Sequence, residues 1–123
     1  MTKNKHLSTT AIHGSQLRDA HGSPHQPIYN TTTFAFENTA ALLDVIDGRE
    51  KGALYTRYGM NPTIFALEET MAAIEGAEAA LSFTSGMAAE SALFLTHGRD
   101  GIVCIGDVYG GTMELLSDQL PLL

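Results

Sequence analysis

The hydrophobic residues of the first regular segment recur at the spacing of a helix. Leu42, Val45 and Ile46 fall on one helical face, and more polar positions separate them. Asn38 or Thr39 can cap the start of this helix, because their short side chains accept hydrogen bonds from backbone N–H groups. The pattern therefore predicts a short amphipathic helix that begins just after residue 38.

A longer apolar stripe follows between Asn61 and Gly76. Asn61 can act as the helix cap, and Pro62 suits the first helical position because its missing N–H would have no partner there. Gly76 stands where a glycine often ends a helix. The pattern predicts a second and stronger helix whose apolar stripe is Ile64, Leu67, Met71 and Ile74.

Two shorter apolar runs, 79–84 and 102–105, favour strands. The first runs into Ser85-Gly86-Met87 and an alanine-rich helical stretch through about Leu95, and the second leads to a last helix ended by Pro121. The repeated order of strand, turn and helix predicts an α/β fold with parallel strands and right-handed crossovers. So few parallel strands leave faces and edges uncovered, so we expect more protein to complete the sheet.

The N-terminal part of the chain has a different character. Residues 1 to about 35 are polar, contain four of the five histidines and show no helical period. We predict an extended arm that depends on other parts of the protein for its order. Residues 49–60 combine charges, glycines and tyrosines and favour an irregular loop. These differences divide the chain into 1–60, with arm, short helix and loop, and 61–123, the start of an α/β domain.

Composition excludes several classes of protein. The chain has 123 residues, 44% of them hydrophobic, which is enough for one ordinary domain. Its net charge is -7, and its seven Lys and Arg residues are scattered, so we expect no nucleic-acid partner. No apolar run approaches the roughly 20 residues of a membrane helix, and no signal peptide follows the start. We therefore expect a cytoplasmic protein that does not bind a membrane.

Neither cysteine nor histidine indicates a special site. Cys104 cannot form an internal disulfide, and its position between Val103 and Ile105 predicts a buried strand residue. His21 and His25 are four residues apart, but the glycine and proline between them prevent a helical metal pair. We expect no metal.

Ser85-Gly86-Met87 is placed where a strand passes into a helix. Such helix N-termini offer unpaired N–H donors and the positive end of the helix dipole. The amides of Gly86 and Met87 could hold a phosphate while Ser85 caps the helix. A plain strand-to-helix turn would also explain these residues.

Two further residues could contribute to a phosphate site. Tyr109 follows the next predicted strand, and its aromatic face could stack on a flat cofactor ring. Arg57, in Tyr55-Thr56-Arg57, offers a guanidinium suited to phosphate. Taken singly, each has an ordinary alternative: a tyrosine packed on a glycine turn, and a surface arginine.

A series of motifs runs along the chain in a fixed order. They are Thr10–Gly14, Pro27–Phe34, Tyr55–Thr63, Leu67-Glu68, Ile74–Glu78, Thr84–Ala89 and Asp107–Thr112. Their order and spacing resemble those of the Cys/Met metabolism, or trans-sulfuration, family of pyridoxal 5'-phosphate (PLP) enzymes. That family includes cystathionine γ-synthase, cystathionine lyases, O-acetylhomoserine sulfhydrylase and methionine γ-lyase. The resemblance spans about residues 10 to 120.

The resemblance implies a fold, a cofactor and a set of site residues. The fold is the aspartate-aminotransferase-like (fold type I) architecture, with 61–123 as the start of its PLP-binding domain. Ser85, Gly86 and Met87 would bind the PLP phosphate, and Tyr109 would stack on the pyridine ring. Tyr55 and Arg57 would reach the phosphate of a neighbouring subunit in a homotetramer, a dimer of dimers, and Tyr55 would also act catalytically in proton transfer.

The resemblance also implies an amino-acid substrate. This would be a sulfur amino acid or an activated homoserine, and the reaction would be elimination or replacement at the β or γ carbon, as in lyases and transferases of methionine and cysteine metabolism. PLP stabilises the carbanion that this chemistry requires.

The chain departs from the family pattern in two places. Three residues, Tyr58 to Met60, stand where the family has two, and a loop bulge would absorb the extra one. The lysine that forms a Schiff base with PLP lies downstream in the family, and the lysines here are Lys3, Lys5 and Lys51. The alternative to an enzyme is therefore a catalytically inactive fragment or a non-catalytic partner subunit.

Overall fold

The computed structural model describes residues 6–15, 17 and 19–122. The chain divides into two compact units, Met1–Leu81 and Ser82–Leu123, which are described separately. The division that we predicted after residue 60 concerns the role of the segments, and it stays a prediction. No helix within the described residues is long and apolar enough to cross a membrane.

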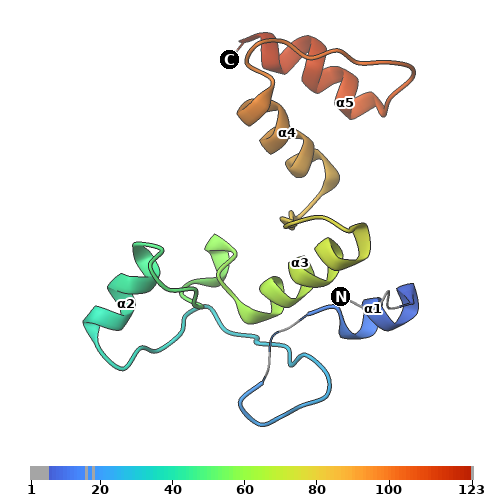
Figure 1. Cartoon of the computed structure of the whole chain (residues 1–123). Coiled ribbons are helices and arrows are strands. Elements are labelled where there is room, and N and C mark those ends of the chain that lie inside the picture. The colour runs from blue at the N-terminus through green and yellow to red at the C-terminus, as the bar shows by residue number, and fades with distance from the viewer. Residues whose placement is uncertain (1–5, 16, 18, 123) are drawn as a thin grey trace. The chain divides into compact units, whose positions relative to one another are not determined.

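Within its described residues, the first unit contains three α-helices and a short 3-10 turn (Figure 1). Their bounds are α1 Leu7–His13, α2 Thr39–Ile46, η1 Thr56–Tyr58 and α3 Pro62–Glu75. The helices α2 and α3 confirm the two helices predicted from the apolar stripes. The side chain of Asn61 accepts a 2.8 Å hydrogen bond from Thr63 N, and Gly76 ends α3 in the left-handed conformation with φ of 66°.

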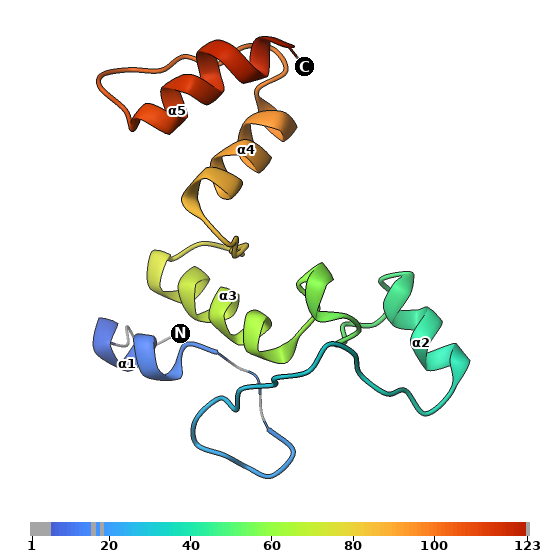
Figure 2. The same ribbon diagram turned by 180° about the vertical axis from the view of Figure 1, so that it is seen from behind.

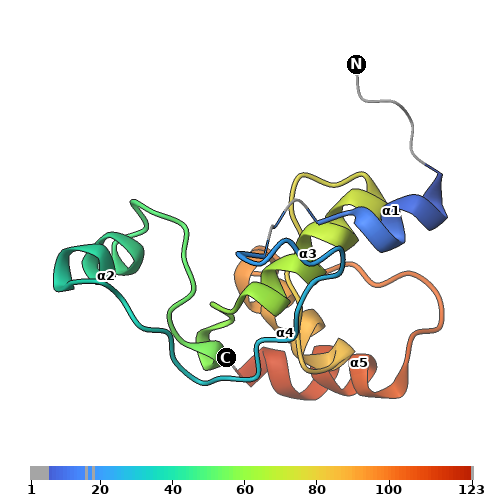
Figure 3. The ribbon, with the colours of Figure 1, turned by 90° about the horizontal axis from the view of Figure 1, so that it is seen from below.

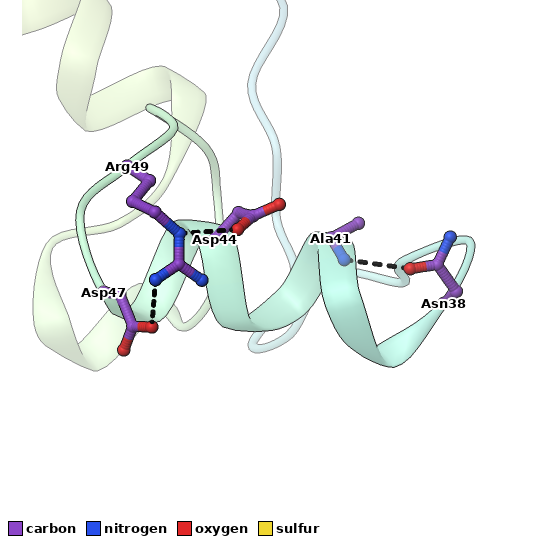
Figure 4. A network of polar contacts seen from close by, with 5 residues as sticks. All are labelled: Asn38, Ala41, Asp44, Asp47 and Arg49. Carbon is purple, nitrogen blue, oxygen red and sulfur yellow. Dashed lines mark hydrogen bonds and ion pairs between the residues drawn. The ribbon is translucent and has the colours of Figure 1, made fainter.

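Polar side chains form hydrogen bonds and ion pairs at both ends of the helix α2 (Figure 4). Asn38 Oδ1 accepts a 2.9 Å hydrogen bond from Ala41 N at the start of the helix. At its end, Arg49 donates from Nε to Asp44 and from Nη1 to Asp47, each at 2.7 Å. A cation at this position also interacts favourably with the negative end of the helix dipole.

The N-terminal arm is less irregular than its sequence predicted. Its residues Leu7–His13 form α1, which lies beside α3 (Figure 3). Ser15 Oγ donates a 3.0 Å hydrogen bond to Glu69 Oε2, and a Cβ on Gly14 would stand 3.1 Å from Thr70 Cα. No residue of α1 is buried, so its helical form depends on contacts with α3 and not on an apolar stripe of its own.

The second unit contains α4, Gly86–His97, and α5, Gly110–Glu114. The helix α5 continues through a π-helical turn, Leu115–Gln119, and a 3-10 turn, Leu120–Leu122. Pro121 therefore lies within the last helical turn, one residue before its end. The helix predicted from the alanine-rich stretch corresponds to α4.

The two predicted strands are not formed in the part of the chain that the structure describes. The segments 79–84 and 102–105 are irregular, and the pairing observed is an isolated antiparallel bridge between Thr33 and Tyr55. A strand requires hydrogen bonds to a neighbouring strand, and neither segment has a neighbouring strand among the described residues. Cys104 is consequently exposed and not buried as predicted, and its neighbours Val103 and Ile105 are 88% and 89% exposed.

The buried core is small in both units. The buried hydrophobic residues are Val45, Ala66 and Ala72 in the first unit and Leu115 in the second. Among the residues that the structure describes, the polar residues Asn61 and Thr112 are buried as well. Asn61 is the cap of α3, and Thr112 lies in the first turn of α5.

Candidate functional site

The start of α4 presents two unpaired backbone donors. Ser85 is extended, with φ of -158°, and its Oγ accepts a 3.1 Å hydrogen bond from Ala88 N, as predicted for a cap. The N–H groups of Gly86 and Met87 precede the first intrahelical bond, and neither donates to another described residue. Apart from its two chain neighbours and the backbone of α4 itself, no described residue comes within 4 Å of the position that a Cβ on Gly86 would take. An anion therefore has both open space and donors at this helix start.

Tyr109 lies near the same helix start. It is the residue before α5 and is 73% exposed, so its ring is not enclosed in apolar packing. A Cβ on Gly111 would stand 2.7 Å from Tyr109 Cε1 and 3.3 Å from Met87 Sδ. Met87 and Tyr109 thus border the same glycine, and the second unit brings these two predicted site residues together.

A polar contact that the sequence did not reveal holds this arrangement. Thr112 Oγ1 donates a 2.6 Å hydrogen bond to Glu90 Oε2, which connects the first turn of α5 to the second turn of α4. Thr112 is buried, at 7% exposure. No pattern in the sequence indicates this pair, because Glu90 stands in an alanine-rich helix and carries no motif of its own.

Tyr55 and Arg57 belong to the first unit and lie in the loop that leads to α3. The Arg57 guanidinium carbon lies 5.4 Å from the centroid of the Tyr55 ring, and the ring of Tyr58 meets that of Tyr55 edge-on at 5.0 Å. Arg57 and Tyr58 are exposed. The pocket of about 460 Å³ beside them is lined by Thr33, Phe34, Phe36, Leu42, Leu54, Tyr55, Arg57 and Tyr58.

The three residues between Arg57 and Asn61 form a tight turn. Gly59 has φ of 77°, in the left-handed region, and its N–H donates to Thr56 O at 2.9 Å. After the turn, Met60 O accepts a 3.1 Å hydrogen bond from Leu54 N. This hydrogen bond joins the residues before and after the turn, so Tyr55 and Arg57 lie in a segment whose two ends are held together.

Acidic and sulfur ligands do not gather anywhere in the described residues. No group of three or more His, Cys, Asp or Glu side chains there could hold a metal ion. The chemistry available at the helix start of α4 is therefore the binding of an anion by backbone N–H groups, beside an exposed aromatic ring.

Comparisons with known proteins agree on one group. The family model of Cys/Met metabolism PLP-dependent enzymes matches residues 8–123. The L-methionine gamma-lyase of Pseudomonas deceptionensis is 42% identical over 117 residues, which are 93% of this chain and 29% of that protein. The O-acetyl-L-homoserine sulfhydrylase of Leptospira meyeri is 38% identical and matches 100% of this chain and 28% of its own.

Solved structures show the same relationship. A putative O-acetylhomoserine (thiol)-lyase from Campylobacter jejuni, with N'-pyridoxyl-lysine-5'-monophosphate, superposes with a TM-score of 0.80 at 31% identity. The metB protein of Corynebacterium glutamicum superposes with a TM-score of 0.75 at 39% identity. Each match covers 97% of this chain and 30% of the other. The chain spans less than a third of the length of these relatives, and it corresponds to their N-terminal part.

Proposed function

Because the chain belongs to the Cys/Met metabolism PLP-dependent enzyme family, we propose that it contributes the phosphate-binding part of a trans-sulfuration enzyme. The family predicted from the order of the motifs is thereby confirmed, as is the incomplete fold type I domain. The proposed substrates are sulfur amino acids or activated homoserine. The observation that carries the proposal is the pair of unpaired N–H groups at Gly86 and Met87 with the exposed ring of Tyr109 beside them.

The residues at the start of α4 fit the phosphate group of PLP. Gly86 N–H and Met87 N–H would donate to phosphate oxygens, and the positive end of the helix dipole would favour the negative charge. Ser85 keeps the helix start in place, because its Oγ is already committed to Ala88 N. Tyr109 would stack on the pyridine ring, as its exposure allows. When bound, PLP supplies an electron sink for a carbanion at the substrate Cα.

We assign Tyr55 and Arg57 to the phosphate of a neighbouring subunit in a homotetramer. The Arg57 guanidinium would pair with phosphate oxygens, which suit its planar fork of donors. The Tyr55 phenol oxygen would take up or release a proton next to the substrate. The position of the guanidinium over the Tyr55 ring supports a joint role, because the two side chains already lie together.

Elimination and replacement at the β or γ carbon, and a cytoplasmic location, are part of the same proposal. No observation favours the alternative of an inactive fragment or a non-catalytic partner subunit, and the matched relatives above carry enzyme names.

Proline at residue 86 would test the donor role of this helix start. Gly86 is the first residue of α4 and follows an extended residue, so Gly86→Pro keeps a conformation that proline favours and removes the N–H. A lost hydrogen bond to a charged group costs about 1.5–3 kcal/mol, so the dissociation constant for PLP should rise about 10-fold to 100-fold. The measurement is a fluorescence titration of the complete apoprotein with PLP.

Thr39→Pro is the matched control for this test. Thr39 is the first residue of α2, follows the extended residue Asn38 and is exposed, so the substitution is equivalent in its effect on a helix start. We expect unchanged PLP affinity for Thr39→Pro. Gly86→Pro binding PLP as tightly as the unaltered protein would overturn the proposed donor role.

A further inference from the structure

Asn61 has more hydrogen bonds than a helix cap requires. Its side chain is the most buried polar one described, at 2% exposure. Oδ1 accepts from Thr63 N at 2.8 Å, which is the cap itself. Nδ2 donates to Tyr29 O and to Thr56 Oγ1, both at 3.0 Å. The amide therefore joins three parts of the first unit: the start of α3, the N-terminal arm and the loop of Tyr55 and Arg57.

Thr56 connects the loop to the arm from the other side. Its Oγ1 donates to Thr31 O at 2.5 Å, and its N–H donates to Thr32 O at 2.9 Å. The adjacent Tyr55 forms the antiparallel bridge with Thr33. The backbone on both sides of Thr56 is thus fixed by the arm, while the hydroxyl of Thr56 accepts from Asn61.

Thr63 holds the same stretch of arm to α3. Its Oγ1 accepts from Tyr29 N at 2.9 Å and donates to Pro27 O at 3.4 Å. Tyr29 therefore has its N–H bound by Thr63 and its carbonyl bound by Asn61. Figure 2 shows the arm passing the start of α3 where these contacts lie.

We propose that Asn61 is a positioning residue for Tyr55 and Arg57, acting through Thr56, and that its amide donors matter separately from its cap. The inference rests on the proposed function of Tyr55 and Arg57. Thr56 stands between these two residues, so the contact that fixes Thr56 also fixes where their side chains begin. A buried amide with both N–H bonds satisfied favours one arrangement, because leaving a buried donor unpaired costs about 1–3 kcal/mol.

Asn61→Asp separates the two roles of the side chain. Aspartate keeps an oxygen that accepts from Thr63 N and is an equally good cap, but it has no N–H to donate to Tyr29 or Thr56. In the complete protein we expect amide exchange at Thr63 to stay slow, exchange at Thr56 and Tyr29 to accelerate, and the PLP dissociation constant to rise at least about 5-fold, the order of one lost hydrogen bond.

Asn38→Asp is the matched control, because Asn38 caps α2 in the same way. Its Oδ1 accepts from Ala41 N, and its Nδ2 donates to no described residue (Figure 4). We expect this variant to leave both amide exchange in the loop and PLP affinity unchanged. A drop in affinity equal to that of Asn61→Asp would show a general effect of added charge and would overturn the inference.

Three further variants cover the other outcomes. Should Asn61→Asp not fold, Thr56→Val removes the hydroxyl that accepts from Asn61, and Thr56→Ser should restore PLP affinity because it restores that hydroxyl. A Thr56→Val protein with unaltered affinity would overturn the inference. Arg57→Ala separates the proposed function of Arg57 from the positioning role of Asn61. Unaltered PLP affinity in Arg57→Ala contradicts the proposed function. A loss of PLP affinity in Arg57→Ala without a loss in Asn61→Asp contradicts only the role of Asn61.

Discussion

The hydroxyl of Thr112 donates a 2.6 Å hydrogen bond to Oε2 of Glu90, and this bond joins the first turn of α5 to the second turn of α4. The first turn of α4 carries the unpaired N–H groups, and the residue before α5 is Tyr109. The contact between Thr112 and Glu90 therefore sets the distance between a proposed phosphate site and a proposed stacking ring. Because Thr112 is buried, water does not compete easily for this bond.

We expect Thr112→Val to destabilise the second unit by about 1–2 kcal/mol, because the shape is kept and the bond to a carboxylate is lost. Thr112→Ser keeps the hydroxyl and should cost less. Urea denaturation of the complete protein, with amide exchange at residues 110–114, measures both. Equal stability of the valine and serine variants would contradict a stabilising role for this hydrogen bond.

Gly111→Ala should displace the ring of Tyr109, because the new Cβ would stand 2.7 Å from Cε1. Loss of the stacking interaction, worth about 0.5–1.5 kcal/mol, would raise the PLP dissociation constant about 3-fold to 10-fold. Gly110→Ala is the control, since no atom lies within 4 Å of its Cβ position. A PLP titration measures the dissociation constant of both variants. Equal dissociation constants for Gly111→Ala and Gly110→Ala would contradict a stacking role for the Tyr109 ring.

Gly59→Ala should cost about 1–2 kcal/mol of stability, because an alanine is strained in the left-handed conformation. The φ of Gly59 is 77°, and nothing lies within 4 Å of the Cβ position, so backbone strain is the whole effect. Gly59→Asn should cost less, since asparagine tolerates this conformation. Denaturation curves rank the three proteins, and a ranking with alanine above asparagine would disprove the conformational explanation.

Arg49→Ala should change stability by less than about 1 kcal/mol, despite two short ion pairs. The side chains of Arg49, Asp44 and Asp47 are 58%, 41% and 49% exposed, so solvent screens their attraction. Raising the salt concentration should reduce even this difference. Thermal unfolding at low and high salt provides the measurement, and a large loss that salt does not alter would indicate a packing role for the arginine stem.

The helices α2, α3 and α4 were predicted correctly from the sequence, whereas the prediction of two strands was wrong for the described residues. The stripe from Ile64 to Ile74 and the cap at Asn61 are local signals, and they fixed both ends of α3. The segment 102–105 has the composition of a strand, but strand formation depends on a partner that the composition of one segment does not supply. The helix α1 was missed for the opposite reason, because contacts with α3 and not periodicity stabilise it.

The site was predictable where it depends on helix starts. Ser85 caps α4 as expected, and the N–H groups of Gly86 and Met87 are unpaired because of their place in the helix. The pair Thr112 and Glu90 lies 22 residues apart, and no spacing rule connects them. The amide donors of Asn61 were likewise hidden, because a cap explained the residue completely at the level of sequence.

The bridge between Thr33 and Tyr55 brings together the two ends of the intervening segment, which contains α2. The bridge closes this segment as a loop. A change of its length at the exposed residues Asp47–Lys51 therefore need not shift Thr33 and Tyr55, where the loop begins and ends. A peptide tag or a fluorescent reporter inserted there would consequently leave the geometry around Tyr55 intact. The loop between Thr33 and Tyr55 is therefore a suitable site for labelling the protein without disturbing its chemistry.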